Sequence, residues 1–140
     1  MKSSLKSLLF SLLIMTFLGE GCEYQDKESD YYNFKVMASD GDFTGYYVVD
    51  AGSFNYFTGS QVTGTIYWTY EKNLESPKSI LIKVTAKDDN ASGISVYVYQ
   101  NSELVASADG TRSYNATTGK YDKAIVSLSY TFTTTTTTTK

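Results

Sequence analysis

Two acidic clusters hold the side chains best suited to binding a ligand ion. Asp40 and Asp42 form a D-x-D pair in "SDGDF", and Asp88 and Asp89 precede an Asn in "KDDNASG". Calcium takes about six to eight oxygen ligands, which loops of this composition can supply. Neither cluster shows the full D-x-D-x-D-G register, so the alternative is that these carboxylates cap backbone amides in turns. The sequence therefore predicts no metal site. The four aspartates are the only candidate ligands that we single out for calcium.

The composition argues against most catalytic chemistry. The 140 residues include no His and a single Cys, so most zinc, haem and iron–sulfur sites and every His-based triad lack a necessary side chain. Two carboxylates could act as a glycosidase pair only across a cleft, for which so small a domain has little room. The net charge of −3 argues against binding to nucleic-acid phosphates. We expect no cofactor, no nucleic-acid partner and no enzymatic activity.

The only cysteine, Cys22, follows the most apolar stretch of the chain. A positive segment, "MKSSLK", precedes "LLFSLLIMTFLG", a run of about a dozen residues that fits a signal-peptide core and is too short for a membrane-spanning helix. Gly21 then supplies a small residue before the Cys. This segment resembles a bacterial lipoprotein signal peptide, although Glu20 and the early Leu18 depart from the usual lipobox.

The resemblance implies that residues 1–21 are removed, that the Cys22 thiol is diacylglycerylated, and that the new amino terminus is acylated, for example with palmitate. Two or three such chains attach a protein stably to a membrane. An ordinary signal peptide with an incidental Cys and a retained membrane anchor are the alternatives. Residues 22–33 would form an acidic tether, which resembles the export signals of Bacteroidetes surface lipoproteins. The expected location is the bacterial cell envelope, at the outer membrane or cell surface rather than the inner membrane.

Residues 34–132 show the period-two alternation of half-buried strands. The clearest cases are residues 79–87, 94–99 and 124–132, and "VTGTIYWTYEK" (62–72) would direct Ile66, Trp68 and Tyr70 inward. Residues 34–39, 43–50 and 103–108 are further candidates. Turn-forming Asp, Asn, Ser and Gly separate these segments. The pattern predicts an all-β fold, an antiparallel immunoglobulin-like β-sandwich of about seven strands.

The connections suggest how the strands are joined. Asn101-Ser102 lies at the tip of a predicted hairpin, and we expect the strand at 79–87 to extend that hairpin into a meander. "NLESPKS" reads as a longer crossover. The order Trp68, "ILIKVTAKD", "ISVYVYQNSELVASA" resembles the small immunoglobulin-like domains of the membrane-protein accessory family called MmpS, whose domains usually carry cysteines that this chain lacks. The last segment, 133–140, contains seven consecutive Thr and is expected to be a free tail.

Tyrosine is the most over-represented side chain, with 13 copies. Tyr67, Tyr97 and Tyr99 fall on the predicted outer faces of their strands. Outward aromatic residues are typical anchors of binding interfaces and sugar platforms. The alternative is that these rings form cross-strand pairs or lie under other segments.

Together these features predict a lipid-anchored bacterial envelope protein that acts as a non-catalytic binding or structural module and is displayed at the surface, with a protein or glycan ligand. The alternative is an accessory subunit of an envelope transport complex, which the resemblance to the MmpS family favours. A small enzyme is the third hypothesis, and the missing His disfavours it.

Overall fold

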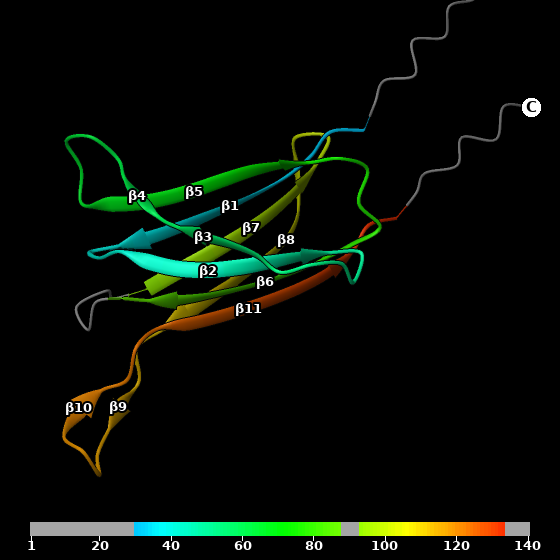
Figure 1. Ribbon diagram of the computed structural model, residues 1–140. Coiled ribbons are helices and arrows are strands. Elements are labelled where there is room, and N and C mark those ends of the chain that lie inside the picture. Colours follow the sequence, from blue (N-terminus) through cyan, green and yellow to red (C-terminus); the bar gives the residue numbers. More distant parts are fainter. Residues whose placement is uncertain (1–29, 88–92, 134–140) are drawn as a thin grey trace, which may run out of the picture.

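The computed structural model describes residues 30–87 and 93–133, which form two antiparallel β-sheets packed face to face (Figure 1). In spatial order, the first sheet contains β4 (Ser60–Gln61), β5 (Tyr67–Leu74), β1 (Tyr32–Ser39), β7 (Gly93–Gln100) and β8 (Glu103–Thr111). The second contains β11 (Ile125–Thr131), β6 (Ser79–Ala86), β2 (Phe43–Val49) and β3 (Asn55–Thr58). The prediction of an all-β, antiparallel sandwich is confirmed.

Seven strands of seven to nine residues form most of the two sheets, and each matches a segment that the alternation predicts. The shorter strands β3 and β4 are additional. A further ribbon pairs β9 (Tyr114–Asn115) with β10 (Lys120–Tyr121). It projects from the end of the sandwich opposite to the one where β1 begins (Figure 1).

The core lies between the sheets and consists of every second residue of the long strands. In β1, Phe34 and Val36 are fully buried, and all eight residues of this strand pair with β5 on one side and β7 on the other. The alternating aliphatic residues of β6 and β7 are buried in the same way: Ile80, Ile82, Val84, Ile94, Val96 and Val98. This burial of one face per strand is the arrangement that a period of two dictates.

A set of packed aromatic side chains completes the core. The Phe34 ring lies 5.0 Å from that of Tyr47 in β2, and the rings of Phe57 and Tyr70 stack at 4.2 Å with an interplanar angle of 15°. Because Phe57 belongs to β3 and Tyr70 to β5, this stack ties an edge strand of the second sheet to the first sheet. Aromatic pairs of this kind contribute about 0.5–1.5 kcal/mol beyond the area they bury.

Two predicted connections are confirmed. Asn101 and Ser102, with φ angles of 53° and 67°, form the tight turn between β7 and β8, since a two-residue hairpin of this type needs positive φ at both positions. The segment with Pro77 carries the chain from β5 in the first sheet to β6 in the second.

The predicted meander is wrong. β6 and β7 do not pair; they belong to opposite sheets. β7 instead pairs with β1, and β6 lies between β2 and β11. Both strands carry one continuous aliphatic face, so they can bury these faces against each other across the core, which an in-plane hairpin would prevent.

The inward position predicted for Ile66 is also wrong, because this side chain is 58% exposed. β5 begins one residue later, at Tyr67, and Ile66 belongs to the preceding turn, where its carbonyl accepts a hydrogen bond from the Asp40 amide. Trp68 and Tyr70 do pack against the core, as the alternation predicts.

The start of the sandwich differs slightly from the predicted boundary. β1 begins at Tyr32, two residues before position 34, and both Tyr32 and Asn33 are buried. The predicted signal peptide, Cys22 and residues 134–140 of the Thr-rich segment lie outside the described residues. Among the residues described, no helix is long and apolar enough to cross a membrane.

Substituting Ile82 should test the core. Ile82→Val removes one methylene from a fully buried position and should lower the free energy of unfolding by about 1 kcal/mol. Ile125→Val makes the same chemical change on the outer side of the second sheet, where Ile125 is 54% exposed, and should change it by less than about 0.5 kcal/mol. Urea unfolding of the two variants measures the difference, and equal effects would contradict this assignment of faces.

Two tyrosines, Tyr32 in the core and Tyr70 packed against it, should make stability fall at high pH. Burial raises the pKa of Tyr70, with a smaller contribution from nearby Tyr47, and burial together with a hydrogen bond to Asp30 raises the pKa of Tyr32. Between about pH 10 and the raised values, these hydroxyls stay protonated when folded but ionise when unfolded, so the free energy of unfolding decreases as pH rises.

Urea unfolding at about pH 8 and about pH 11 should reveal this loss. Tyr70→Phe removes the titrating hydroxyl and should make the alkaline loss smaller than in the wild type. An identical loss in the two proteins would show that Tyr70 does not contribute.

Candidate functional site

The three tyrosines predicted as a binding face lie on the outer side of the first sheet but do not form one cluster. Tyr97 pairs with Lys35 of β1 and Tyr99 with Asn33, whereas Tyr67 pairs with Ser39 at the other end of that strand. Tyr67 and Tyr97 are therefore four residues apart along the strands, about 13 Å at the rise of a β-strand. Only Tyr67 is largely exposed, at 46%, while Tyr97 and Tyr99 are half-buried.

A polar network surrounds Tyr99 on this face. Asn33 is only 8% exposed, and its side-chain amide donates a hydrogen bond of 2.9 Å to Glu71 Oε1. Tyr31 Oη donates to Asn73 Oδ1 at 2.6 Å. Part of the outer side of the first sheet is thus built from polar groups that bond to one another, while Asn33 Oδ1 is buried without a hydrogen-bond partner among the described residues.

The acidic cluster at Asp42 has a structural role. Asp42 Oδ1 accepts a hydrogen bond from the Phe43 amide at 2.7 Å, and its Oδ2 pairs with Lys87 Nζ at 2.8 Å. Asp40 occupies a turn with φ of 59°. Asp88 and Asp89 lie outside the described residues, and within the described ranges no three His, Cys, Asp or Glu side chains group together as a metal site.

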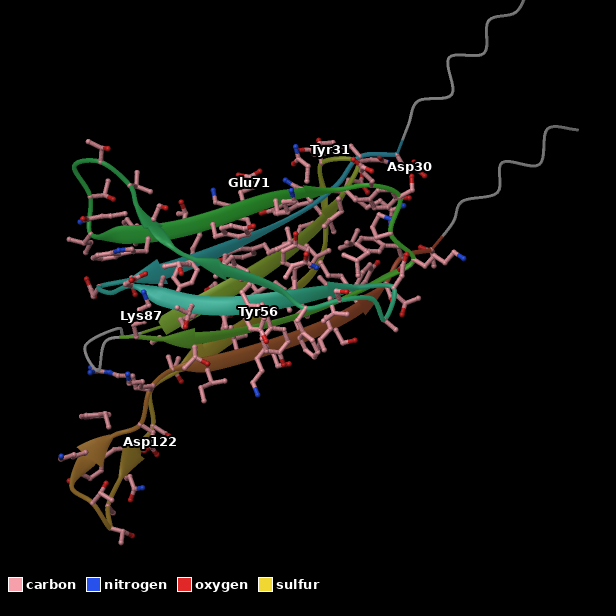
Figure 2. All side chains as sticks on the ribbon, viewed as in Figure 1. Asp30, Tyr31, Tyr56, Glu71, Lys87 and Asp122 are labelled. Carbon is pink, nitrogen blue, oxygen red and sulfur yellow. The ribbon has the colours of Figure 1, made fainter. Side chains whose placement is uncertain are left out.

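A second set of aromatic side chains, not singled out from the sequence, lies on the outer side of the second sheet. Tyr46, Phe54 and Tyr56, the aromatic cluster from here on, contact one another: Tyr46 and Phe54 meet edge to face at 5.0 Å, Tyr46 and Tyr56 at 6.0 Å. Phe54 and Tyr56 stack at 6.4 Å with 24° between their planes. Phe54 is 58% exposed and Tyr56 79%, and Tyr56 projects from the outside of the sandwich (Figure 2).

Strand pairing places a cation beside these rings. Tyr46 in β2 pairs with Tyr56 of β3 on one side and with Lys83 of β6 on the other, so the three side chains form one row across the sheet. Residues on this row and the next line a shallow hollow of about 180 Å³: Thr44, Gly45, Tyr46, Tyr56, Lys83 and Thr85. The arrangement offers exposed aromatic rings, hydroxyl groups and one ammonium group within a small area.

Gly45 supports the aromatic cluster from the core side of β2. A Cβ at this position would lie 2.7 Å from the Lys83 carbonyl oxygen and 2.8 Å from Cζ of Phe57. Glycine therefore lets the Phe57 ring pack directly under β2, which holds β3 in place beside Tyr46.

The sequence does contain a signal for the aromatic cluster. In "FNYFT", Phe54 and Tyr56 occupy alternate positions, and the buried Phe57 has the opposite direction. Likewise Tyr46 is the neighbour of the buried Tyr47 and points to the other side of its strand. The cluster does not follow from the predicted strands because β3, a four-residue strand that begins at Asn55 just past "DAGS", is not among them.

A third aromatic feature lies on the projecting β9–β10 ribbon. The rings of Tyr114 and Tyr121 meet at 5.2 Å, and the Arg112 guanidinium lies 4.7 Å from the centre of the Tyr121 ring. Both tyrosines are more than half exposed. An isolated two-stranded ribbon is only marginally stable in water. The aromatic and cation–π contacts of its own side chains help to stabilise this one.

No family model matches this chain, and neither a curated protein nor a solved structure matches it. The resemblances to lipoprotein signal peptides and to the MmpS family therefore stay predictions. The aromatic cluster, with Lys83 beside it, is the candidate site that the geometry of the described residues favours.

Adding a methyl group at Gly45 should disturb the site from beneath. Gly45→Ala should lower the free energy of unfolding by about 1–3 kcal/mol, because Phe57 or the Lys83 backbone must move to accept the Cβ. Gly93→Ala is the control, since a Cβ there would lie 3.7 Å from its nearest neighbour, the Gly110 carbonyl oxygen. Thermal or urea unfolding of both variants measures the difference, and a Gly45→Ala protein as stable as Gly93→Ala would be inconsistent with this packing.

Proposed function

We propose that this protein is attached to the bacterial envelope through lipid on Cys22 and that its β-sandwich is a non-catalytic binding module. The observation that carries the proposal is the aromatic cluster. Exposed rings that contact one another, rather than lying singly over the surface, are typical of sites where a ligand covers them.

The anchor is supported by the amino-terminal sequence. A positive segment, an apolar run of signal-peptide length and a small residue precede the chain's only cysteine. Diacylglycerylation converts that thiol to a thioether and supplies two acyl chains, and acylation of the new amino terminus adds a third, which is enough for stable attachment. The outer membrane or cell surface is the proposed location.

The geometry of the sandwich fits such an anchor. β1 begins at one end of the sandwich, so a tether that precedes Asp30 would leave from that end (Figure 1). The aromatic cluster lies on the side of the second sheet, and the β9–β10 ribbon at the remote end. A protein held by its amino terminus would therefore keep both features accessible.

An accessory role in an envelope transport complex is the second candidate, and the projecting ribbon favours it. Tyr and Arg are enriched among the residues that contribute most to protein binding, and Tyr114 and Tyr121 of the ribbon are exposed. In that case, replacing Tyr114 and Tyr121 with Ala should release the protein from the complex in detergent extracts, as seen by native electrophoresis, while its attachment to the membrane is unchanged.

The test of the anchor is the chemical state of Cys22. The intact mass of membrane-extracted protein should correspond to a chain that begins at Cys22 and carries acyl additions, and Cys22→Ala should leave the protein folded but move it to the soluble fraction. An unmodified thiol at Cys22 in the mature protein would overturn the anchor.

The test of display uses the same cysteine. Since Cys22 is the only thiol of the chain and a thioether does not react with maleimides, Tyr56→Cys should be the single labelled position when intact cells meet a membrane-impermeant maleimide. Val96→Cys, at a fully buried position, is the matched control and should react only after unfolding. If Tyr56→Cys were labelled only in broken cells, surface display would be refuted.

A further inference from the structure

We propose that the aromatic cluster and Lys83 together bind acidic glycans, with a pyranose ring lying on the exposed rings and its carboxylate at Lys83 Nζ. This inference rests on the proposed function, because it names the ligand class of the same site. Four features of the second sheet support it: the accessibility of the rings, the polarity of the surface around them, the shape of the site and the charge beside the rings.

The rings offer the apolar contact that a sugar needs. One face of a pyranose presents C–H groups, which pack against the face of an aromatic ring and remove apolar surface from water. Phe54 has no polar atom, so its ring can offer a ligand only this kind of contact. With Phe54 58% exposed, Tyr56 79% exposed and the two planes only 24° apart, the rings form an open surface on which a sugar ring can lie.

The surface around the rings is rich in hydroxyl groups. Thr44 and Thr85 line the hollow beside Tyr56, and further hydroxyl side chains point outward from the same sheet: Thr58, Ser127, Ser129 and Thr131. The apolar side chains of this outer face, apart from the rings, are Val48, Leu81 and Ile125. The cores of protein interfaces are poor in Ser and Lys, whereas a sugar must exchange its hydrogen bonds with water for bonds to such groups. This composition favours a glycan over a protein as the occupant.

The shape of the site points to a ligand that lies across the surface. The hollow has a volume of about 180 Å³, less than the roughly 300–1,000 Å³ of sites that enclose a small molecule. It is continuous with the exposed rings, since Tyr46 and Tyr56 belong to both. An extended glycan can place one sugar on the rings while its neighbours remain in solvent.

The positive charge at the site favours an anionic ligand. Among the outward side chains of β2, β3, β6 and β11, Lys83 is the only charged one. In the described part of the chain, the carboxylate of Asp42 pairs with Lys87, and no carboxylate pairs with Lys83. An ammonium group that no carboxylate of the described residues pairs with, next to the rings on an otherwise neutral sheet face, favours a ligand with a carboxylate at that position.

The experiment compares two forms of one ligand. The probes are oligogalacturonate of defined length and the same oligomer after chemical reduction of its carboxyl groups, with mannuronate and hyaluronan oligomers as further acidic probes. Calorimetry on the full chain in detergent should show tighter binding of the acidic form by about two- to fivefold, the contribution of one exposed ion pair.

Variants separate the rings from the charge. Tyr56→Ala should weaken the binding of both forms by about tenfold. Lys83→Gln should remove the preference for the acidic form without weakening the reduced form, and Lys83→Arg should retain the preference. Tyr31→Ala, which removes an exposed tyrosine that precedes β1 of the first sheet, is the matched control and should bind as the wild type does.

The outcomes are distinguishable. Equal affinity for the acidic and reduced forms would overturn the assignment of Lys83, and wild-type affinity of Tyr56→Ala would overturn the assignment of the rings. If no probe bound, the glycan assignment would fail while the mass of Cys22 and the labelling of Tyr56→Cys could still support an anchored, displayed protein. A free thiol at Cys22 would overturn the anchor and leave the measured glycan affinities unaffected.

Discussion

The pairing of β1 between β5 and β7 is the constraint on which the rest of this protein depends. Phe34 and Val36 of β1 are fully buried, so Lys35 between them must point away from the core. Because β5 and β7 pair with β1 over its whole length, the same division into inner and outer faces extends across the first sheet. The second sheet then has to supply the matching apolar surface, which β6 and β2 provide.

The candidate site follows from how that second sheet closes over the core. Phe57 stacks on Tyr70 of the opposite sheet at 4.2 Å, which holds β3 against the core. Once Phe57 points inward, the alternation turns Tyr56 outward, beside Tyr46 of the neighbouring strand. The residues that pack the core therefore also determine which aromatic rings are left for a ligand.

The two outer faces of the sandwich have different chemistry. On the first sheet, several polar groups bond to one another, as between Asn33 Nδ2 and Glu71 and between Ser95 and Asp109, although Asn33 Oδ1 is buried without a partner among the described residues. On the second, aromatic rings and Lys83 lie exposed without such bonds in the part of the chain described. A surface whose polar groups are already paired gains little from a ligand, whereas exposed rings gain by being covered. This difference is the physical basis for choosing the second sheet.

The sequence by itself determined the seven long strands, the hairpin at Asn101-Ser102 and the crossover near Pro77, because alternation and turn chemistry are local properties that a short segment expresses on its own. The tertiary structure alone decided that β6 and β7 lie in opposite sheets, that Ile66 is exposed and that Tyr67 is remote from Tyr97. It also decided that Tyr46 and Tyr56 meet beside Lys83. The reason is that sheet membership depends on which distant strands pair, and a period of two specifies a strand's buried face but not its neighbour.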